Sequence, residues 1–334
     1  MDLEEFLSEW HNDSPTVLVH TSGSTGKPKP MWVEKRRMEA SARITCGFLG
    51  LKAGDTALLC MSLDYIAGKM MVVRAETCGL RLISVEPCGK PYWEDPVDFA
   101  AMVPLQVWNL LHDEDGRKRL MEVKHLIIGG GAIDDALAQK LRSFPHAVWS
   151  TYGMTETLSH IALRRLSGSE ASDWYTPFEG IRISLNDDNC LVIDAPAVHD
   201  GPLITNDIAE LKTPPLNKGG REGSSPFRIL GRKDNVICSG GIKIQIEEVE
   251  RMLRPHLAWP YMVTYAPDQR LGQQVVLLLE GGDASEAATV CRTILPKYWQ
   301  PRRIVVVSRL PYTATGKPAR AEAAKEFNNL YHKE

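Results

Sequence analysis

The chain has 334 residues, of which 43% are hydrophobic and 24% are charged, with a formal net charge of −3 at pH 7. Such numbers indicate two or three packed domains and lack the basic patch of a nucleic-acid or anionic-membrane binder. The seven cysteines include no C-x-x-C pair, which argues against structural zinc and for a reducing, cytoplasmic location. The sequence also contains no signal-peptide core and no apolar run of roughly 18 residues, so we expect no membrane association.

Predicted helices and strands alternate through the first half of the chain. A short amphipathic helix opens it, because Leu3, Phe6, Leu7 and Trp10 recur at helical spacing. The predicted strands are 16–19, 55–63, 82–85, 99–103, 125–128 and 147–149, and the further helices are 34–48, 68–78, one that begins at Pro104, and 134–141. This alternation predicts a mostly parallel, doubly wound sheet.

The pattern changes after about residue 175. Short strands are predicted at 181–185, 190–193, 208–211 and 227–230, and the segment 213–226 is expected to be an exposed hairpin loop. A smaller α+β module then follows, with strands at 236–238, 242–246, 261–265, 274–279 and 304–307 and helices at 246–253, 285–295 and 319–329. We therefore predict an α/β protein with a large doubly wound core domain over 1–231, a hinge at 232–234 and a smaller C-terminal domain over 235–334.

A loop of hydroxyls, glycines and lysines follows the first predicted strand, and its residues are Thr21, Ser22, Gly23, Ser24, Thr25, Gly26 and Lys27. Glycines let backbone N–H groups approach an anion, hydroxyls donate hydrogen bonds and lysine supplies charge, so the loop suits phosphates. Only two residues separate Gly23 from Gly26, so the spacing is not that of a Walker A motif. A flexible Ser/Gly/Thr turn is the alternative interpretation.

A second motif, from Tyr152 to Glu156, follows the predicted strand 147–149. A carboxylate behind a hydroxyl at the carboxyl end of a strand is suited to magnesium and phosphate. The same residues could instead begin a helix, with Thr155 or Thr157 as its N-cap.

Three further motifs lie in the second half of the chain. The charged segment 231–235 suits a hinge, although it could equally be a charged turn. The segment 239–241 predicts a tight hairpin turn that lets another molecule pass close to its backbone. The segment 313–318 contains a lysine in a Gly/Thr loop.

In their fixed order, these motifs resemble the adenylate-forming superfamily of acyl-CoA synthetases, nonribosomal-peptide adenylation domains and luciferases. The resemblance covers nearly the whole chain and implies ATP, Mg²⁺ and CoA as cofactors. It assigns the β- and γ-phosphates to residues 21–27, the adenine to Gly130, Gly131, Ala132 and Tyr152, the α-phosphate to Thr155, Mg²⁺ to Glu156 and the ribose to Asp207 and Arg232. It also makes Lys317 the catalytic lysine, Asp234 the pivot of a mobile C-terminal domain, and Gly240 and Gly241 the border of the pantetheine tunnel.

The resemblance implies a two-step reaction. A carboxylate attacks the α-phosphorus of ATP and gives an acyl-adenylate and pyrophosphate, and a thiol then attacks the adenylate. Catalysis is mainly positioning and charge stabilisation. The C-terminal domain is expected to rotate between the two steps.

The chain departs from the superfamily at its start, because about 19 residues precede the phosphate loop where most members have a long N-terminal portion. We expect the exposed flank to be covered by Phe6, Leu7 and Trp10 or by a second subunit, which makes a homodimer possible.

Within the superfamily, the stretches 61–68, 103–108 and 152–163 look most like o-succinylbenzoate–CoA ligases of menaquinone biosynthesis. In such ligases an arginine at the position of Arg74 meets the substrate carboxylate. Arg74 lies in an otherwise apolar helix and needs a partner, which could instead be Glu76 or Asp64. Ser159 and His160 would border the acyl pocket, with His160 in a packing role rather than as a general base.

The resemblance favours an ATP-dependent acid–CoA ligase that activates a small-molecule aromatic carboxylic acid as acyl-AMP and transfers it to CoA, most of all o-succinylbenzoate. One alternative is an adenylating enzyme that loads a carrier-protein phosphopantetheine. Another is a non-catalytic ATP-binding remnant, against which the intact Glu156, Asp207, Arg232 and Lys317 argue.

Overall fold

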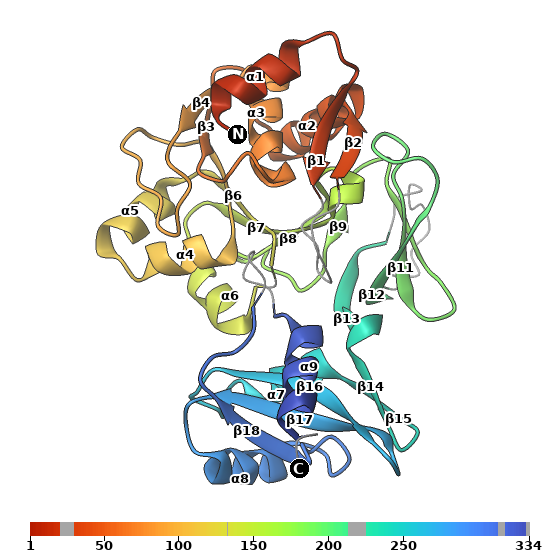
Figure 1. Ribbon diagram of the computed structural model, residues 1–334. Coiled ribbons are helices and arrows are strands. Elements are labelled where there is room, and N and C mark those ends of the chain that lie inside the picture. The colour runs from red at the N-terminus through yellow and green to blue at the C-terminus, as the bar shows by residue number, and fades with distance from the viewer. Residues whose placement is uncertain (21–29, 132, 213–224, 313–317, 332–334) are drawn as a thin grey trace. The chain divides into compact units, whose positions relative to one another are not determined.

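The computed structural model describes residues 1–20, 30–131, 133–212, 225–312 and 318–331 (Figure 1). The chain forms two compact units. The first comprises residues 1–184, 192–204 and 211–228, and the second comprises 185–191, 205–210 and 229–334. The domain limits predicted from the sequence, 1–231 and 235–334, stay a prediction.

A seven-stranded sheet organises the first unit, in the order β4-β3-β5-β6-β7-β8-β9. Its first five strands are parallel: β4 (Arg81–Ser84), β3 (Thr56–Leu59), β5 (Phe99–Met102), β6 (His125–Ile128) and β7 (Ala147–Gly153). The last two, β8 (His160–Arg165) and β9 (Thr176–Pro177), are antiparallel. The mostly parallel sheet predicted from the sequence is confirmed.

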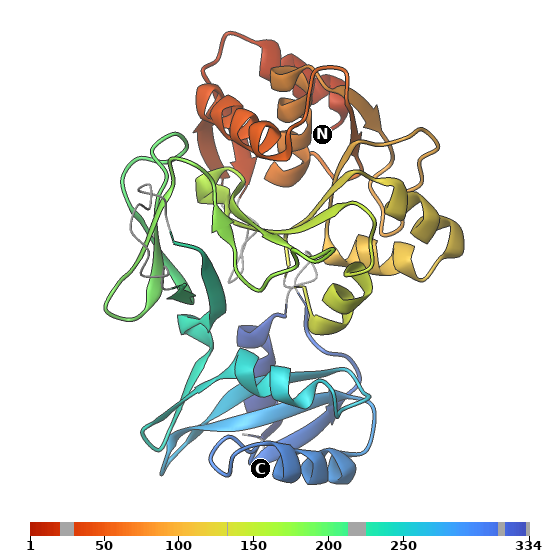
Figure 2. The same ribbon diagram turned by 180° about the vertical axis from the view of Figure 1, so that it is seen from behind.

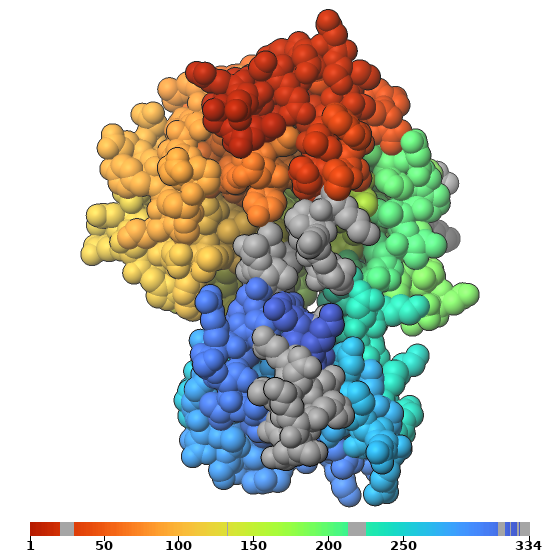
Figure 3. Space-filling view, viewed as in Figure 1, coloured from red at the N-terminus to blue at the C-terminus, as the bar shows by residue number. Residues whose placement is uncertain are grey.

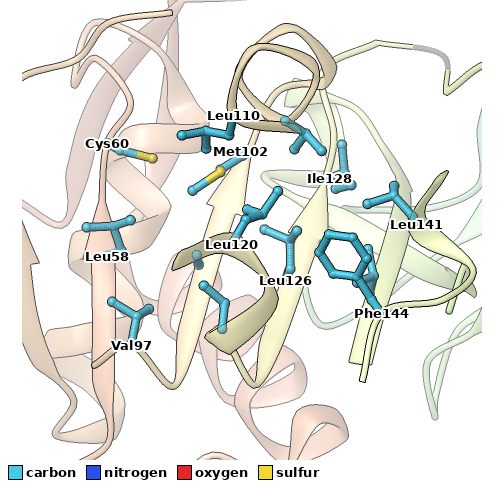
Figure 4. Close-up of a cluster of buried hydrophobic side chains, with 14 of the residues drawn as sticks. Leu58, Cys60, Val97, Met102, Leu110, Leu120, Leu126, Ile128, Leu141 and Phe144 are labelled. Atoms are coloured by element: carbon cyan, nitrogen blue, oxygen red, sulfur yellow. The ribbon is translucent and has the colours of Figure 1, made fainter. Parts of the chain in front are cut away.

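Helices cover both faces of this sheet. One face packs against α4 (Pro104–Leu111), α5 (Glu114–Glu122) and α6 (Asp135–Leu141), in a core that includes Met102, Leu110 and Leu120 (Figure 4). On the other face, α3 (Ile66–Cys78) packs beside α2 (Lys35–Leu49), and Phe99 points toward α3. Alternate residues of a strand point to opposite faces, so β5 contributes to both layers and the sheet is doubly wound.

The N-terminal segment forms the outer surface of the first unit (red in Figure 3). Its elements are α1 (Leu3–His11) and an antiparallel pair, β1 (Thr16–His20) and β2 (Pro30–Glu34). Phe6 is fully buried, Trp10 is nearly so and Leu7 is half-buried, and α1 is tied to α3 by ion pairs from Glu9 to Lys69 and from His11 to Glu76. That these three side chains cover the flank stays a prediction.

A four-stranded sheet follows, in the order β10 (Arg182–Leu185), β11 (Cys190–Asp194), β12 (Leu203–Leu211) and β13 (Phe227–Arg232). The division between the two units runs through these strands. Residues 213–224 of the predicted hairpin loop lie outside the described residues.

The second unit has a five-stranded sheet, β15-β14-β17-β16 with β18 paired to β17. Its strands are β14 (Val236–Ser239), β15 (Ile242–Gln245), β16 (Tyr261–Asp268), β17 (Gly272–Glu280) and β18 (Arg303–Val307). The helices α7 (Ile246–Leu253) and α8 (Ala284–Ile294) pack on one face, and α9 (Arg320–Tyr331) packs on the other. Accordingly, α9 lies in front of the sheet in Figure 1 and α7 lies in front of it in Figure 2.

Local sequence signals explain several element ends. Pro104 occupies the first turn of α4, and the Asp134 side chain caps α6 by accepting a hydrogen bond from the Leu137 backbone N–H at 2.7 Å. Gly50 ends α2 with φ of +70°. All seven cysteines are free. Among the described residues, none of the helices has both the length and the apolar character that crossing a membrane requires.

Candidate active site

The carboxyl ends of β6 and β7 bring two of the predicted motifs together. The strands are parallel neighbours with Ile128 opposite Ser150, so Gly129 follows one strand beside the end of the other. A Cβ atom at Gly129 would lie only 2.3 Å from Thr151 Oγ1, so this position requires glycine. Gly130 has φ of +79°, which also favours glycine, whereas Ala132 lies outside the described residues.

Tyr152, Thr155 and Glu156 lie at the end of β7. The Tyr152 ring is half-buried and meets the Phe227 ring edge-on at 5.1 Å between centroids. Thr155 is buried and Glu156 is exposed in a one-turn 3₁₀ helix, η1 (Thr155–Thr157). Neither threonine is an N-cap, because Met154 takes that position and its backbone N–H donates to Thr157 Oγ1 at 3.1 Å.

A γ-turn at Leu158 connects this motif to the predicted acid-binding residues. Leu158 has φ of +63° and ψ of −33°, and the Ser159 backbone N–H donates to the Thr157 carbonyl at 2.7 Å. A non-glycine residue in this conformation is strained, and such strain is typical of functional sites. The chain then passes Gly153 so closely that a Cβ there would lie 2.3 Å from the Ser159 carbonyl oxygen. The turn therefore fixes Ser159 and His160 against the end of β7.

Arg74 reaches the same turn from α3. Its guanidinium Nη2 donates to Ser159 Oγ at 2.6 Å, its Nη1 lies 3.7 Å from Met71 Sδ, and the residue is only 2% exposed. Its Nε is buried and has no hydrogen-bond partner among the residues that the structure describes. Burial lowers the pKa of Arg74 to about 10.

Neither carboxylate that the sequence offered as a partner contacts Arg74. Glu76 pairs with His11 at 3.0 Å, and Asp64 pairs with the amino group of Met1 at 3.1 Å. Across the described part of the chain, Arg74 has no ion pair. Its charge is therefore buried with no opposite charge against it among these residues.

His160 is buried behind Ser159. Its Nδ1 lies 3.1 Å from Ser159 Oγ, and its Nε2 lies 3.2 Å from Oγ1 of Thr45, a residue of α2. Burial first, and the charge of Arg74 second, hold the pKa of His160 well below its usual value. A neutral, buried imidazole fits the predicted packing role. Sequence analysis did not identify Thr45; its one signal was a threonine on the buried face of a helix.

The second unit brings together Asp207, Arg232 and Asp234. Arg232 pairs with Asp207 at 3.2 Å and with Asp234 at 2.9 Å, and Asn206 Nδ2 lies 3.3 Å from the Asp234 carboxylate. The predicted hinge residue lies in η2 (Lys233–Asn235), directly after β13. The charged segment is thus a short helical turn held by ion pairs.

Gly240 and Gly241 form the turn between β14 and β15, as predicted. Their φ values of +58° and +83° are those of a two-residue type I′ hairpin, which suits glycine. Thr21, Ser22, Gly23, Ser24, Thr25, Gly26, Lys27 and Lys317 lie outside the described residues.

Glu156 suits a magnesium site with a single protein carboxylate. In the portion of the chain that the structure describes, no group of three or more His, Cys, Asp and Glu side chains could enclose a metal. Mg²⁺ commonly takes one or two carboxylates and fills its remaining positions with water and substrate phosphates. The exposed Glu156 is suited to a site of this kind.

Two features of this site are typical of nucleotide-binding α/β enzymes: the glycines that follow β6, and the hydroxyl and carboxylate of Thr155 and Glu156 that follow β7. The chain belongs to the AMP-binding enzyme family, which residues 4–198 match. It is an AMP-forming acyl-CoA synthetase, a class of ligases that works with ATP, Mg²⁺ and CoA.

Among its relatives, the chain is similar to the 2-succinylbenzoate–CoA ligase of Listeria monocytogenes, with 25% identity over 94% of this chain and 70% of the relative. It is 28% identical to the ligase of the same name from Salmonella typhimurium, over 88% of this chain and 65% of the relative. A probable 2-succinylbenzoate–CoA ligase of Mycobacterium tuberculosis is 27% identical over 96% and 87% of the two chains.

Solved structures show the same fold. An AMP-forming acyl-CoA synthetase-like protein from Dyadobacter fermentans is 30% identical, with a TM-score of 0.63 over 97% of this chain and 92% of that chain. The o-succinylbenzoate CoA synthetase of Bacillus subtilis, in complex with its acyl-adenylate intermediate, is 24% identical with a TM-score of 0.73. That match covers 92% of this chain and 68% of that chain.

Proposed function

We propose that this protein activates o-succinylbenzoate with ATP and transfers the acyl group to CoA, in menaquinone biosynthesis. The names of the Listeria, Salmonella and Mycobacterium relatives support this substrate. The observation that carries the proposal is the buried, uncompensated guanidinium of Arg74.

A buried charge without a partner is costly, so its retention needs a reason. Arg74 donates to one neutral hydroxyl, Ser159 Oγ, and keeps an unsatisfied Nε. A carboxylate is the group that a guanidinium fork recognises best, through two parallel hydrogen bonds. An acid with two carboxylates could keep one on Arg74 while the other is activated.

The ends of β6 and β7 would hold the nucleotide. We assign the adenine to Gly130, Gly131, Ala132 and Tyr152, the α-phosphate to Thr155, the magnesium ion to Glu156, and the β- and γ-phosphates to residues 21–27. The magnesium ion would neutralise phosphate charge. Ser159 follows Thr155 directly after the γ-turn at Leu158, and both residues belong to the first unit. This supports the assignment, because the acid and the nucleotide would then bind to one unit.

We assign the remaining roles to residues of the second unit. Asp207 and Arg232 would bind the ribose, and Lys317 would stabilise the charge that develops on the α-phosphate and the acyl oxygen. We propose that 235–334 rotates as a domain about Asp234 against 1–231, and that Gly240 and Gly241 border the path of CoA. We also propose a cytoplasmic protein that can form a homodimer.

ATP–pyrophosphate exchange tests the proposal. We expect exchange with o-succinylbenzoate and at least about tenfold less with benzoate, and we expect CoA to accept the acyl group. Lys317→Ala should abolish exchange. Transfer only to a carrier-protein phosphopantetheine, or exchange with none of a panel of aromatic acids, would contradict the proposed activity.

A further inference from the structure

The side chains behind Arg74 form a chain of hydrogen bonds that ends on α2. Arg74 Nη2 lies 2.6 Å from Ser159 Oγ, which lies 3.1 Å from His160 Nδ1. His160 Nε2 lies 3.2 Å from Thr45 Oγ1, which lies 3.1 Å from the Ser41 carbonyl oxygen, one helical turn earlier. All of these residues belong to the first unit, and each of them except Ser159 is buried.

One assignment of the protons satisfies every hydrogen bond in this chain. A guanidinium only donates, so Ser159 Oγ accepts from Arg74, and in this assignment the serine proton goes to His160 Nδ1. Nδ1 is then unprotonated, so the imidazole proton is on Nε2 and is donated to Thr45 Oγ1. The Thr45 hydroxyl passes its proton to the Ser41 carbonyl.

The opposite tautomer does not fit the same contacts. With a proton on Nδ1, Ser159 Oγ would accept from both His160 and Arg74 through its two lone pairs, and the serine proton would lose its acceptor on His160. Thr45 would also need to donate to His160 Nε2 and to the Ser41 carbonyl at once, and a hydroxyl has one proton. Thr45 therefore selects the tautomer in which the Ser159 proton points to His160 and both serine lone pairs are left for Arg74.

We propose that Thr45 is a positioning residue that sets the affinity for the acid without touching it. Through His160 and Ser159 it fixes where the Arg74 guanidinium points, and so how the second carboxylate of a diacid is held. This inference rests on the proposed function, because it takes Arg74 as the group that receives that carboxylate. It assigns no base catalysis to His160.

A matched pair of substitutions tests the role in catalysis. Thr45→Val keeps the shape of the fully buried side chain and removes the hydroxyl, whereas Thr45→Ser keeps the hydroxyl. We expect Val to raise the KM for o-succinylbenzoate about tenfold, as one hydrogen bond is worth, with the KM for ATP unchanged. Ser should restore the acid KM to within about threefold of wild type. Equal effects of Val and Ser, or an equal rise of both KM values, would mean that Thr45 only packs.

The tautomer is measured separately, by the ¹⁵N chemical shifts of the His160 ring in the whole protein without substrate. We expect a protonated Nε2 and an unprotonated Nδ1, with the Nδ1–H form gaining population in Thr45→Val. A protonated Nδ1 in the wild type overturns the inference whatever the acid substrate is. If the expected tautomer is found and no acid is activated, the proposed function fails while the hydrogen-bond chain stands.

Discussion

Two arginines, one in each unit, differ in the groups that contact their guanidinium. Arg74 is 2% exposed and meets a serine hydroxyl, a methionine sulfur and the ring of Phe99. The Arg320 side chain is 14% exposed and forms a two-pronged pair with Glu250, at 2.6 and 2.7 Å. It also donates to the Val263 carbonyl at 3.0 Å.

The two pKa shifts follow from this difference. Burial lowers the pKa of Arg74 to about 10. Burial also acts to lower the pKa of Arg320, but hydrogen bonds and charge attraction from Glu250 outweigh it, and that pKa is raised. The Arg320 guanidinium is paired within the protein and serves the fold, whereas we propose that the Arg74 guanidinium receives an anion from outside.

The largest expected effect concerns stability. Arg320→Met should destabilise the second unit by about 3 kcal/mol, because it leaves the part-buried Glu250 carboxylate without its cation and its two hydrogen bonds. Arg74→Met should change the stability of the first unit by less than about 1 kcal/mol, since no buried carboxylate loses a partner. Native-state hydrogen exchange can follow β16 and β17 in one unit and β5 and β6 in the other. Equal losses of stability in Arg320→Met and Arg74→Met would contradict the claim that only Arg320 stabilises the fold through an ion pair.

A carboxylate placed beside Arg74 should give it an internal partner, as Glu250 is for Arg320. Met71 Sδ lies 3.7 Å from Arg74 Nη1, one turn earlier on α3, so Met71→Glu can supply an internal counterion. We expect about a hundredfold loss in kcat/KM for o-succinylbenzoate, because the new carboxylate competes with the substrate for the guanidinium. The control is Met71→Gln, which has the same shape without the charge. If Glu and Gln act alike, the loss comes from altered packing.

A smaller effect is expected in the pH dependence of stability. The folded-state pKa of His160 is lowered by burial, so below its unfolded value of about 6.5 the unfolded chain takes up more protons. Stability is then complete above about pH 6.5 and falls below it, by up to about 1.4 kcal/mol per pH unit. His125, whose pKa burial also lowers, contributes in the same direction.

The measurement is therefore the difference between the wild type and His160→Gln in denaturation of the first unit from pH 7 to pH 5. The variant should lose stability less steeply as the pH falls. Parallel curves would show that His160 accepts a proton in the folded state as readily as in the unfolded chain.

Elements with a local signal could be predicted from the sequence. Pro104 and Asp134 marked helix starts, Gly50 marked a helix end, and apolar strands such as β6 were recognisable from their composition. The strand β2 was missed because its pairing with β1 is set by partners across the loop that joins them. The helix α5 was missed because only Gly116 and Leu120 are buried, which gives no apolar stripe. The strands β8 and β9 were also missed, since each depends on pairing with a neighbouring strand.

In the candidate site, too, the features that depend on tertiary contacts could not be predicted from the sequence. Arg74 was noticeable as a charge in an apolar helix, but its lack of a carboxylate partner depends on where Glu76 and Asp64 point. The positive φ of Leu158 could not be predicted, because residues that favour this conformation are usually glycine or asparagine. Thr45 lies 115 residues from His160 in the sequence, so their contact exists only in the folded protein.

The central claim is that the charge of Arg74 is reserved for a second carboxylate of the substrate. It is tested most directly by measuring kcat/KM in ATP–pyrophosphate exchange for wild type and Arg74→Met. Each is assayed with o-succinylbenzoate and with its analogue in which the carboxylate that is not activated is an amide. We predict a loss of about a hundredfold from the amide in the wild type and less than about threefold in Arg74→Met. An equal loss in both proteins would show that the second carboxylate binds elsewhere.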